Sequence, residues 1–569
     1  MATNISKEKR EKLIEKINAI KTFIQQAPQD KNTKNLLTYI AEIEKDIKGK
    51  KYGLVFEEHK EAIDDILENN VPILKEDESL FIDNGGQMNF LIEGDNLASL
   101  QLLEKILKGK IDLIYIDPPY NTGGNDFVYD DKFIDSTDLF NHSKWLSFMH
   151  SRLCIAKNLL SLTGFIFISI GDEEVSSLKL LCDDIFGETN YISCCTRVAK
   201  RTSNKGTFFK PTKDYVLVYA KNVSSITWKF GAGNKINIKD FKYKDENGQY
   251  KKNGASLYQP SLDSRPNQRY YIKCPDGSLI IPPGNVFPEK EEDGAQVKPL
   301  SNNDKCWRWS RDTYLSNKSK LIFTKASSSC PLIDSNGNPS KWNIYDKVYL
   351  SDKENETLLP EDVIYDYVNS QGTKSVLNLG LNFSFAKPVG LVQFLIEITK
   401  LPNDITILDF FAGSGTTGHA VMRLNAEDGG NRKFILCTNN ENNICRDITY
   451  ERIKRVIEKE KYKASLKYMK VDFVPITDKF YYEYADELLK HVKELVELEN
   501  GINFNGNKEL TIIITEEELD NFMNNIPAEC KTIYLGHDIL PTKEQEEMFK
   551  NNKIKVNIIP DYYYRDLED

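Results

Sequence analysis

The hydrophobic positions of the first 222 residues switch between helical and strand spacing. Residues 1–75 place Leu and Ile three or four positions apart with charged residues between them, which predicts a helical N-terminal region. In residues 76–222 the short apolar runs FLI, LIYI and FIFISI predict strands. Helical spacing follows each run, at 97–110, 144–163 and 173–187. Strands that alternate with helices predict an α/β fold built on a doubly wound, mainly parallel sheet.

The pattern changes twice in the rest of the chain. From 223 to 375 turn residues and aromatic residues are frequent and no long helical spacing continues, which predicts an inserted, separately folded region of short strands and loops. Residues 376–475 return to alternating strands and helices. Residues 476–569 predict a smaller mixed α/β tail, with a helix near 483–500 and three short strands.

Composition narrows the class of protein. A chain of 569 residues with 40% hydrophobic and 28% charged residues is typical of a globular protein with several domains. No apolar run reaches the roughly 18–20 residues of a membrane span, and the N-terminus is polar, so we expect a cytoplasmic location and no membrane partner. The ten cysteines are scattered without CxxC spacing and only six histidines are present, so no metal site is predicted.

Charge is distributed unevenly along the chain, and this affects whether a nucleic-acid partner is expected. The net charge of −10 argues against a nucleic-acid partner. The segment 197–273 nevertheless carries 17 Lys and Arg against five Asp and Glu, a local charge of +12 that leaves −22 for the rest of the chain. We therefore expect a polyanion to be repelled elsewhere and to bind at this basic segment.

The stretch LIYIDPPYNTGG at 113–124 ends a predicted core strand with an acid and two prolines. Proline has no N–H for the ladder, so the chain must leave the sheet at Asp117. Sheets of this class bind ligands at the carboxyl ends of their strands. Asp117, Pro118, Pro119 and Tyr120 are therefore predicted to present a carboxylate, carbonyls and an aromatic ring to a substrate. An ordinary proline-rich turn remains open at this point.

A second strand, ITILD, runs into the glycine turn FFAGSGTTG. Gly413 and Gly415 allow a positive φ and a close approach of the backbone to a ligand. The stretch is not a phosphate loop. GSGTTG has the spacing GxGxxG, but the acid that ends the preceding strand argues against the dinucleotide motif. Asp409 ends the strand, where it could take a cationic or hydroxyl-bearing group. S-adenosylmethionine, a small ligand with an amine and a ribose, fits this turn.

Together, DPPYNTG and DFFAGSGTT resemble the amino-methyltransferases that modify exocyclic amines of DNA bases. The order, with DPPY before FAGSG, is similar to the circularly permuted β-class of that family. Over about residues 50–470 the chain resembles the modification (Mod) subunits of Type III restriction–modification systems, in the segments YGLVFEEH, FLIEGDNLASL, IDPPYNTGG, SKWLSFMHSRL, FISIGDEE, KPVGLVQFLI and KFILCTNNEN. The resemblance implies methyl transfer from S-adenosylmethionine to N6 of a flipped adenine in double-stranded DNA.

The resemblance also implies domains and site residues. A Rossmann-like methyltransferase sheet would be formed by 76–222 and 376–475, with a target-recognition domain at 223–375. The catalytic residues would be Asp117, Pro118, Pro119 and Tyr120. Cofactor binding would fall to Asp95, Lys387, Asp409, Phe411, Ala412, Gly413, Gly415, Thr416 and Asn439, the last standing where related enzymes often carry an acid. Contacts to DNA would come from Lys200, Arg201, Lys205, Arg265, Arg269 and Lys273, with Tyr270, Tyr271, Trp307 and Trp309 packing or wedging.

Partners and alternatives remain open on the sequence. We expect a homodimer, with the helical N-terminus and the tail at 476–569 as the surfaces for dimerisation or partner docking. The resemblance implies a possible separate restriction (Res) helicase–nuclease subunit, since the sequence has no Walker A motif. One alternative is a DNA-binding specificity module that needs a restriction partner. The others are amino-methyltransferases that act on N4 of cytosine, on RNA or on a protein glutamine.

Overall fold

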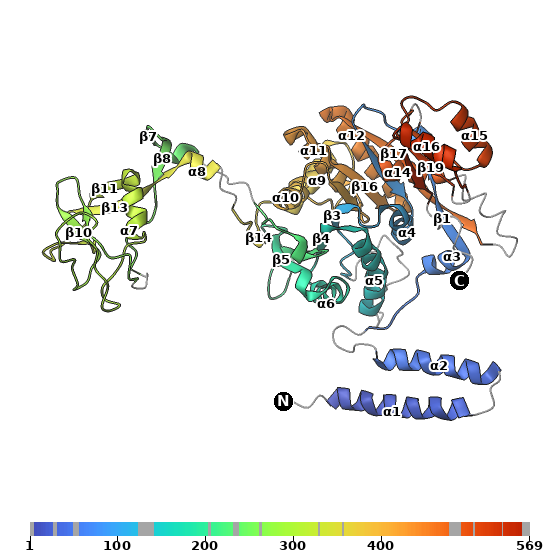
Figure 1. Cartoon of the computed structure of the whole chain (residues 1–569), viewed down its shortest axis with the longest axis horizontal. Coiled ribbons are helices and arrows are strands. Elements are labelled where there is room, and N and C mark those ends of the chain that lie inside the picture. The colour runs from blue at the N-terminus through green and yellow to red at the C-terminus, as the bar shows by residue number, and fades with distance from the viewer. Residues whose placement is uncertain are drawn as a thin grey trace. The chain divides into compact units, whose positions relative to one another are not determined.

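The computed structural model describes residues 5–559 except 27–30, 49–55, 123–140, 203–205, 232–237, 261–264, 328–329, 355–357, 477–490, 505–506 and 537–538. The chain divides into two compact units (Figure 1). One comprises Met1–Lys229 with Glu361–Asp569, and the other is Phe230–Pro360. The second unit lies inside the region 223–375 that the sequence marks as an insert. Both flanks of that region, 223–229 and 361–375, belong to the first unit.

The first unit is built on a ten-stranded sheet. In spatial order its strands are β1 (Asn70–Glu76), β17 (Ala464–Pro475), β2 (Gln87–Glu93), β16 (Lys433–Thr438), β15 (Thr406–Asp409), β3 (Ile111–Ile116), β4 (Leu160–Ile170), β6 (Lys213–Ala220), β5 (Tyr191–Val198) and β14 (Val363–Ile364). The six strands from β17 to β4 are parallel. At the edges, β1 runs antiparallel to β17, and β6 runs antiparallel to both of its neighbours. The predicted doubly wound α/β sheet is confirmed.

Helices cover both faces of this sheet (Figure 1). One layer contains α4 (Asn96–Leu107), α5 (Asn141–Leu159), α6 (Val175–Phe186) and α14 (Val492–Asn500), with α3 (Ala62–Asn69) beside α4. The other contains α9 (Asn369–Asn378), α10 (Val389–Ile398), α11 (Thr416–Asp428) and α12 (Glu451–Glu460). Strands covered on both faces are apolar throughout, which explains why five of the six residues of β3 are buried. Neighbouring strands β15 and β3 are followed by helices of opposite layers, and such a switch point opens a crevice.

Three smaller parts complete the chain. At the N-terminus α1 (Ile5–Gln26) packs against α2 (Lys31–Lys48), with Ile17 and Ile24 buried and Lys21 paired with Glu44. The C-terminal part is a parallel sheet of β18 (Leu510–Ile513), β19 (Thr532–Leu535) and β20 (Lys555–Ile558) with α15 (Glu516–Asn524) and α16 (Lys543–Asn551). No helix in the described ranges combines the length and apolarity needed to cross a membrane.

The unit Phe230–Pro360 has two small antiparallel sheets. The first contains β12 (Ile333–Asp334), β10 (Leu279–Ile281) and β9 (Ile272–Lys273), and the second β11 (Leu321–Lys325), β13 (Trp342–Tyr349), β8 (Gly248–Lys252) and β7 (Tyr243–Asp245). The helices α7 (Arg311–Ser316) and α8 (Leu350–Glu354) are short. Aromatic side chains, among them Tyr270, Trp307 and Tyr314, form its core.

Several element boundaries differ from the expectation. The helix expected at 144–163 ends at Leu159, because the β-strand β4 already begins at Leu160. The strands β1 and β5 and the helices α15 and α16 were not predicted from the pattern. Part of the helix expected near 483–500 lies outside the described residues, and α14 begins at Val492.

A buried lysine joins the helix α14 to the main sheet. Lys467 of β17 is fully buried and its Nζ lies 2.8 Å from Glu76 Oε2 and 2.7 Å from Glu497 Oε2. Glu497 is itself fully buried on α14. Removing the cation would leave two carboxylates without compensation in the interior, which is far more costly than losing a surface pair.

We therefore predict that Lys467→Met lowers the free energy of unfolding by about 3–5 kcal/mol. Lys75→Met is the matched control, because Lys75 pairs with Asp472 on the same two strands but both side chains are about half exposed. The control should cost less than about 1 kcal/mol. Chemical unfolding of both variants measures the difference, and equal losses would contradict the buried role of Lys467.

Candidate active site

Four adjacent parallel strands end in polar residues at one edge of the sheet. Asp95 follows β2, Asn439 follows β16, Asp409 ends β15 and Asp117 follows β3. Cα pairing aligns the carboxyl ends, with Thr438 opposite Glu93, Asp409 opposite Leu436 and Leu408 opposite Ile114. Segments up to 344 residues apart in sequence thus meet at the carboxyl edge, where ligands of this fold class bind.

The glycine turn after β15 has the predicted conformation. Gly413 has φ 49° and Gly415 has φ 73°, backbone values that residues other than glycine rarely adopt. Gly415 is the N-cap residue of α11. A Cβ on Gly413 would meet nothing nearer than 3.8 Å, so this backbone is open to close approach. Beside the turn, Phe411 is buried and packs against Phe148.

Two residues that were not predicted from the sequence, Thr449 and Arg452, form hydrogen bonds to the glycine turn. Thr449, in the π-helix η7 (Ile444–Tyr450), donates a hydrogen bond of 2.5 Å to the Gly413 carbonyl. Arg452 of α12 is buried, and its Nη1 donates to Ser414 Oγ at 2.9 Å and to Thr416 Oγ1 at 2.8 Å. Burial lowers the pKa of this guanidinium to about 9. The sequence could have indicated a buried role for Arg452, because this arginine lies on the apolar face of a predicted helix.

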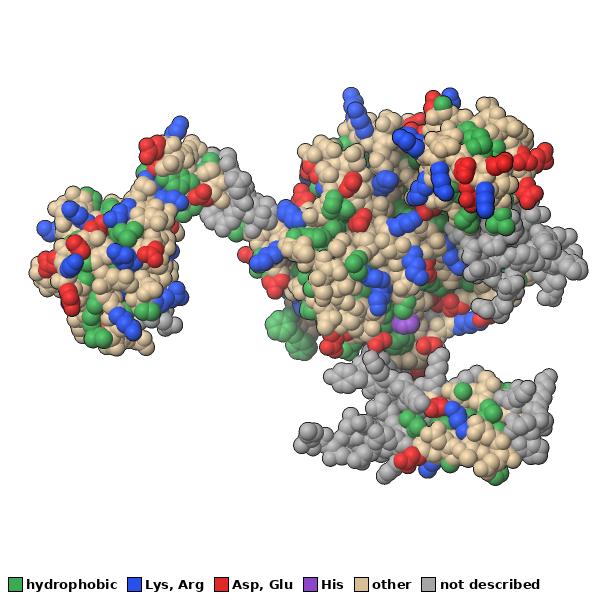
Figure 2. Space-filling view, in the orientation of Figure 1, with side chains coloured by type: hydrophobic (Ala, Val, Ile, Leu, Met, Phe, Trp, Pro, Cys, Tyr) green, Lys and Arg blue, Asp and Glu red, His purple; other side chains and the backbone are tan. Residues whose placement is uncertain are grey.

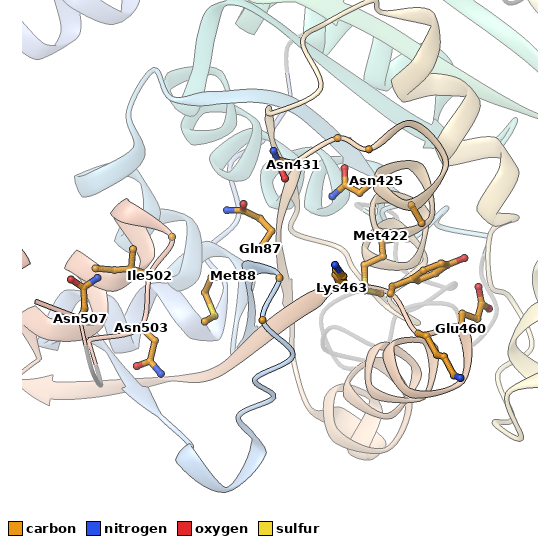
Figure 3. A pocket seen from close by; sticks show the side chains of 18 residues that line it. Gln87, Met88, Met422, Asn425, Asn431, Glu460, Lys463, Ile502, Asn503 and Asn507 are labelled. Atoms are coloured by element: carbon orange, nitrogen blue, oxygen red, sulfur yellow. The ribbon is translucent and has the colours of Figure 1, made fainter. Parts of the chain in front are cut away.

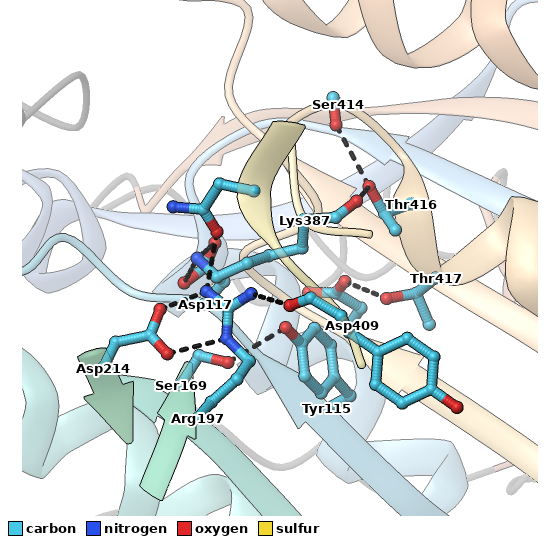
Figure 4. Close-up of polar contacts among 12 residues, drawn as sticks. Tyr115, Asp117, Ser169, Arg197, Asp214, Lys387, Asp409, Ser414, Thr416 and Thr417 are labelled. Carbon is cyan, nitrogen blue, oxygen red and sulfur yellow. Dashed lines mark hydrogen bonds and ion pairs between the residues drawn. The ribbon is translucent and has the colours of Figure 1, made fainter. Parts of the chain in front are cut away.

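Asp409 directs its carboxyl group into the protein. Asp409 is buried, and its carboxyl oxygens accept hydrogen bonds from Phe411 N at 3.0 Å and Thr417 Oγ1 at 2.5 Å (Figure 4). Burial raises the pKa of the Asp409 carboxyl to about 7. The side chain thus fixes the start of the turn.

On the neighbouring strand, Asp117 lies beside Lys387 (Figure 4). Lys387 Nζ donates to both carboxylate oxygens of Asp117, at 2.5 Å to Oδ1, and lies 4.9 Å from the centre of the Tyr120 ring. Lys387 stands two residues before α10, so the pair joins the two sections of the sheet. The sequence placed these residues in a catalytic and a cofactor group, and the structure brings both groups into contact.

Two hydrogen bonds hold the loop after Asp117, one at Pro119 and one at Asn121. The Pro119 carbonyl accepts a hydrogen bond of 2.8 Å from Trp145 Nε1, which is buried. Asn121 adopts φ 57°, and its Nδ2 donates to Glu174 Oε1 at 2.6 Å. Glu174 is fully buried and its Oε1 also lies 2.5 Å from His142 Nδ1. Glu174 belongs to FISIGDEE, a segment singled out in the sequence without a role for this residue.

Arg197 is the second buried charge at this edge. Its guanidinium pairs with Asp214 through two hydrogen bonds and donates to the Tyr367 carbonyl at 2.8 Å and to Asn369 Oδ1 at 2.7 Å. Arg197 is fully buried. The count of surface charge in 197–273 therefore included a residue that cannot reach a polyanion.

Asp95 and Asn439 stand at the far end of the edge. Asp95 caps α4, accepting hydrogen bonds from Leu97 N at 2.7 Å and Ala98 N at 3.3 Å. Its other oxygen lies 3.7 Å from Arg152 Nη2. Asn439 follows β16 directly and is half-buried.

The residues predicted to contact DNA have different outcomes. Lys200 and Arg201 are exposed in the first unit, Arg265 and Lys273 are exposed in the second, and Lys205 lies outside the described residues. On its visible face the second unit intersperses basic with acidic side chains (Figure 2).

The prediction for Arg269 is wrong. Arg269 is fully buried, and its guanidinium donates hydrogen bonds to the carbonyls of Val286, Pro282, Pro283 and Lys305 at 2.8–3.1 Å. It therefore shapes the second unit from inside. The aromatic residues Tyr270, Tyr271 and Trp307 are likewise buried, so they pack the core and offer no wedge.

The edge opposite Asp117 carries a separate pocket of about 850 Å³ (Figure 3). It lies at the amino ends of β2, β16 and β17, where Gln87, Asn431 and Lys463 line it. None of the predicted catalytic or cofactor residues lines it.

Comparison with known proteins agrees with this geometry. A family model described as DNA methylase matches residues 111–451. The Type III restriction-modification enzyme StyLTI Mod subunit of Salmonella typhimurium is 33% identical over 425 residues, which cover 66% of this chain and 58% of that subunit. The EcoPI Mod subunit of Escherichia phage P1 is 32% identical over 394 residues, 63% of this chain and 58% of the subunit. The Type II methyltransferase M.KpnI of Klebsiella pneumoniae is 33% identical over 361 residues, 61% of this chain and 79% of that enzyme.

We predict that Asp409→Asn changes how stability depends on pH. Because the folded pKa of about 7 lies above the usual 3.8, the folded state holds the proton more tightly than the unfolded chain. The wild type should therefore lose stability relative to the neutral variant as pH rises from about 4 through 7, by up to about 4 kcal/mol. Unfolding of both proteins at pH 5 and pH 8 tests this, and a difference independent of pH would contradict it.

Proposed function

The chain belongs to the DNA methylase family, and on this premise we propose that it methylates N6 of adenine at specific sites in double-stranded DNA, with S-adenosylmethionine as the methyl donor. The observation that carries the proposal is the contact of Asp117 with Lys387 at the switch point, beside the open glycine turn. The similarity to Mod subunits supports a role as the modification and specificity subunit of a Type III system. A homodimer and a separate Res subunit remain predictions.

The residues present fit the proposed cofactor. The backbone of Gly413 is open on the side that a Cβ would occupy, and Asp95, Phe411 and Asn439 lie at the same edge. When bound, the cofactor supplies an electrophilic methyl group on a sulfonium. The turn, held by Thr449 and Arg452, would keep that group at a fixed place above β15.

The chemical difficulty is the adenine amino group, whose lone pair is delocalised into the ring. Asp117 and the Pro118 carbonyl would accept its two N–H bonds and localise the lone pair toward the methyl group. A carboxylate has about four lone-pair sites, so the contact with Lys387 leaves room for the amine. Lys387 would fix the orientation of the acceptor. After transfer, N6 would pass its extra proton to the Asp117 carboxylate that already accepts its N–H bond, and from there to water.

Tyr120 would hold the flipped base. Flipping a base costs a few kcal/mol, and stacking on an aromatic ring returns roughly 1–3 kcal/mol. The remainder must come from hydrogen bonds to the base edge and from contacts to the rest of the DNA. Contacts of the Phe230–Pro360 unit with the target sequence are part of this proposal, supported by its exposed Arg265 and Lys273.

We predict that DNA from cells expressing the wild type carries N6-methyladenine in one short motif, and that Asp117→Ala abolishes it because the acceptor of the amino group is lost. Single-molecule sequencing measures both. Asp472→Ala, an exposed aspartate on β17, is the control and should leave the modification intact. N4-methylcytosine in the motif would overturn the choice of base, and the absence of any modified base would move RNA and partner-dependent functions forward.

We further predict that Glu174→Ala lowers kcat by about 10–100-fold, because Asn121 loses its anchor and the catalytic loop shifts. The Kd of S-adenosylmethionine should change less than about twofold, since the glycine turn is untouched. Glu174→Gln keeps the acceptor oxygen and should recover most of the rate.

The matched control for the Glu174 variants is Glu188→Ala, which removes an exposed carboxylate just after α6. A parallel loss of cofactor affinity and rate in Glu174→Ala would show general unfolding of the edge and contradict a positioning role.

A further inference from the structure

Two adjacent phenylalanines stand fully in solvent. Phe208 is 92% exposed and Phe209 91% exposed, more than any other large hydrophobic side chain in the described part of the chain. Soluble proteins seldom present two neighbouring aromatic rings without a function, and such a patch marks an interaction site. The sequence pattern gave these residues no role.

The loop that carries them leaves the sheet at the catalytic edge. Ile170, at the carboxyl end of β4, pairs with Tyr215 near the start of β6. Val198, at the end of β5, pairs with Lys213 at the start of β6. The connection 199–212 therefore starts and finishes at the edge where β3, parallel to β4, delivers Asp117.

The base of the loop is fixed to the neighbouring turn. Ala199 N and Lys200 N both donate to the Thr212 carbonyl, at 2.8 and 3.0 Å. Lys213 Nζ lies 3.0 Å from Asp172 Oδ1, directly after Gly171. A Cβ on Gly171 would lie 2.9 Å from Tyr120 Cδ2, so this turn also touches the proposed base-stacking residue.

The tip of the loop has a constrained backbone. Gly206 has φ 101°, and a Cβ there would lie 2.1 Å from the Phe209 carbonyl oxygen and 3.2 Å from Pro211 Cδ. Only glycine permits this tight turn, and Pro211 fixes the φ of the chain as it leaves. Phe208 and Phe209 are thus presented on a shaped turn.

The charge around the two rings fits a polyanion. Lys200, Arg201 and Lys210 are exposed, and none has an ion pair among the described residues. No Asp or Glu occurs between 198 and 213 in the sequence. Lysine and arginine beside an apolar wedge match a duplex, whose phosphates flank a stack of bases.

We propose that Phe208 and Phe209 insert into the DNA duplex beside the target adenine and fill the space that it leaves when it flips. This inference rests on the proposed function and adds the element that opens the duplex. Aromatic side chains inserted between base steps unstack them, and the neighbouring cations hold the two backbones. Tyr120 then receives the base at the same edge of the sheet.

The test uses a duplex that contains the methylated motif with 2-aminopurine in place of the target adenine. The wild type should raise its fluorescence because the base leaves the stack. The double variant Phe208→Ala/Phe209→Ala should abolish most of this rise and methylate the ordinary duplex about 10–100-fold more slowly. A mismatch opposite the target adenine should restore the rate to within a few-fold of wild type, because an unpaired base is already easy to extrude.

Leu540→Ala removes an apolar side chain of similar exposure, 85%, and should behave as wild type on both duplexes. Normal fluorescence and rate in the double variant would overturn the wedge, as would equal losses on matched and mismatched DNA. A dimeric wild type with a monomeric double variant would assign the rings to contact with a second copy instead. A wild type that methylates no DNA would overturn the proposed function itself, a result distinct from failure of the variant alone.

Discussion

The pairing of β15 with β3 joins two segments whose residues lie 294 positions apart, as in the hydrogen bond from Thr406 N to Asp112 Oδ2. One strand ends in the glycine turn and the other in the DPPY loop. Because their following helices lie on opposite faces of the sheet, neither covers the gap between the two ends. The contact of Lys387 with Asp117, the position of Tyr120 and the openness of Gly413 all depend on this register.

Buried charges surround this edge. Arg197, Arg452 and Glu174 are all inaccessible to solvent, and each is hydrogen-bonded to a loop beside the site. Buried ionic groups contribute little net stability compared with apolar residues of the same size. Their effect is positional: each holds a backbone segment that has few apolar contacts of its own. The site is therefore rigid where it must place a carboxylate and a glycine turn, and exposed where Phe208 and Phe209 project.

The sequence predicted the position of those site residues that stand next to proline or glycine, because these two residues also constrain the backbone. Prolines after Asp117 and glycines after Asp409 must end their strands, so both motifs could be assigned to the carboxyl edge from the sequence. Charge alone was less informative. Arg197 and Arg269 both entered the basic count, but burial against Asp214 and against carbonyls removes them from the surface. Glu174 and Arg452 could not be assigned because their partners, Asn121 and Ser414, are close only after folding. Phe208 and Phe209 were missed because apolar residues are expected inside.

The pairing of β3 with β15 also affects how the chain folds while it is being translated. After the ribosome has produced β3, this strand has no neighbour on one side until β15 emerges nearly 300 residues later. At roughly 5–20 residues per second this interval lasts roughly 15–60 s. An unpaired apolar strand edge is a template for aggregation during such a wait. The nascent chain should therefore depend on chaperones between these two points more than a methylase whose glycine turn is translated first.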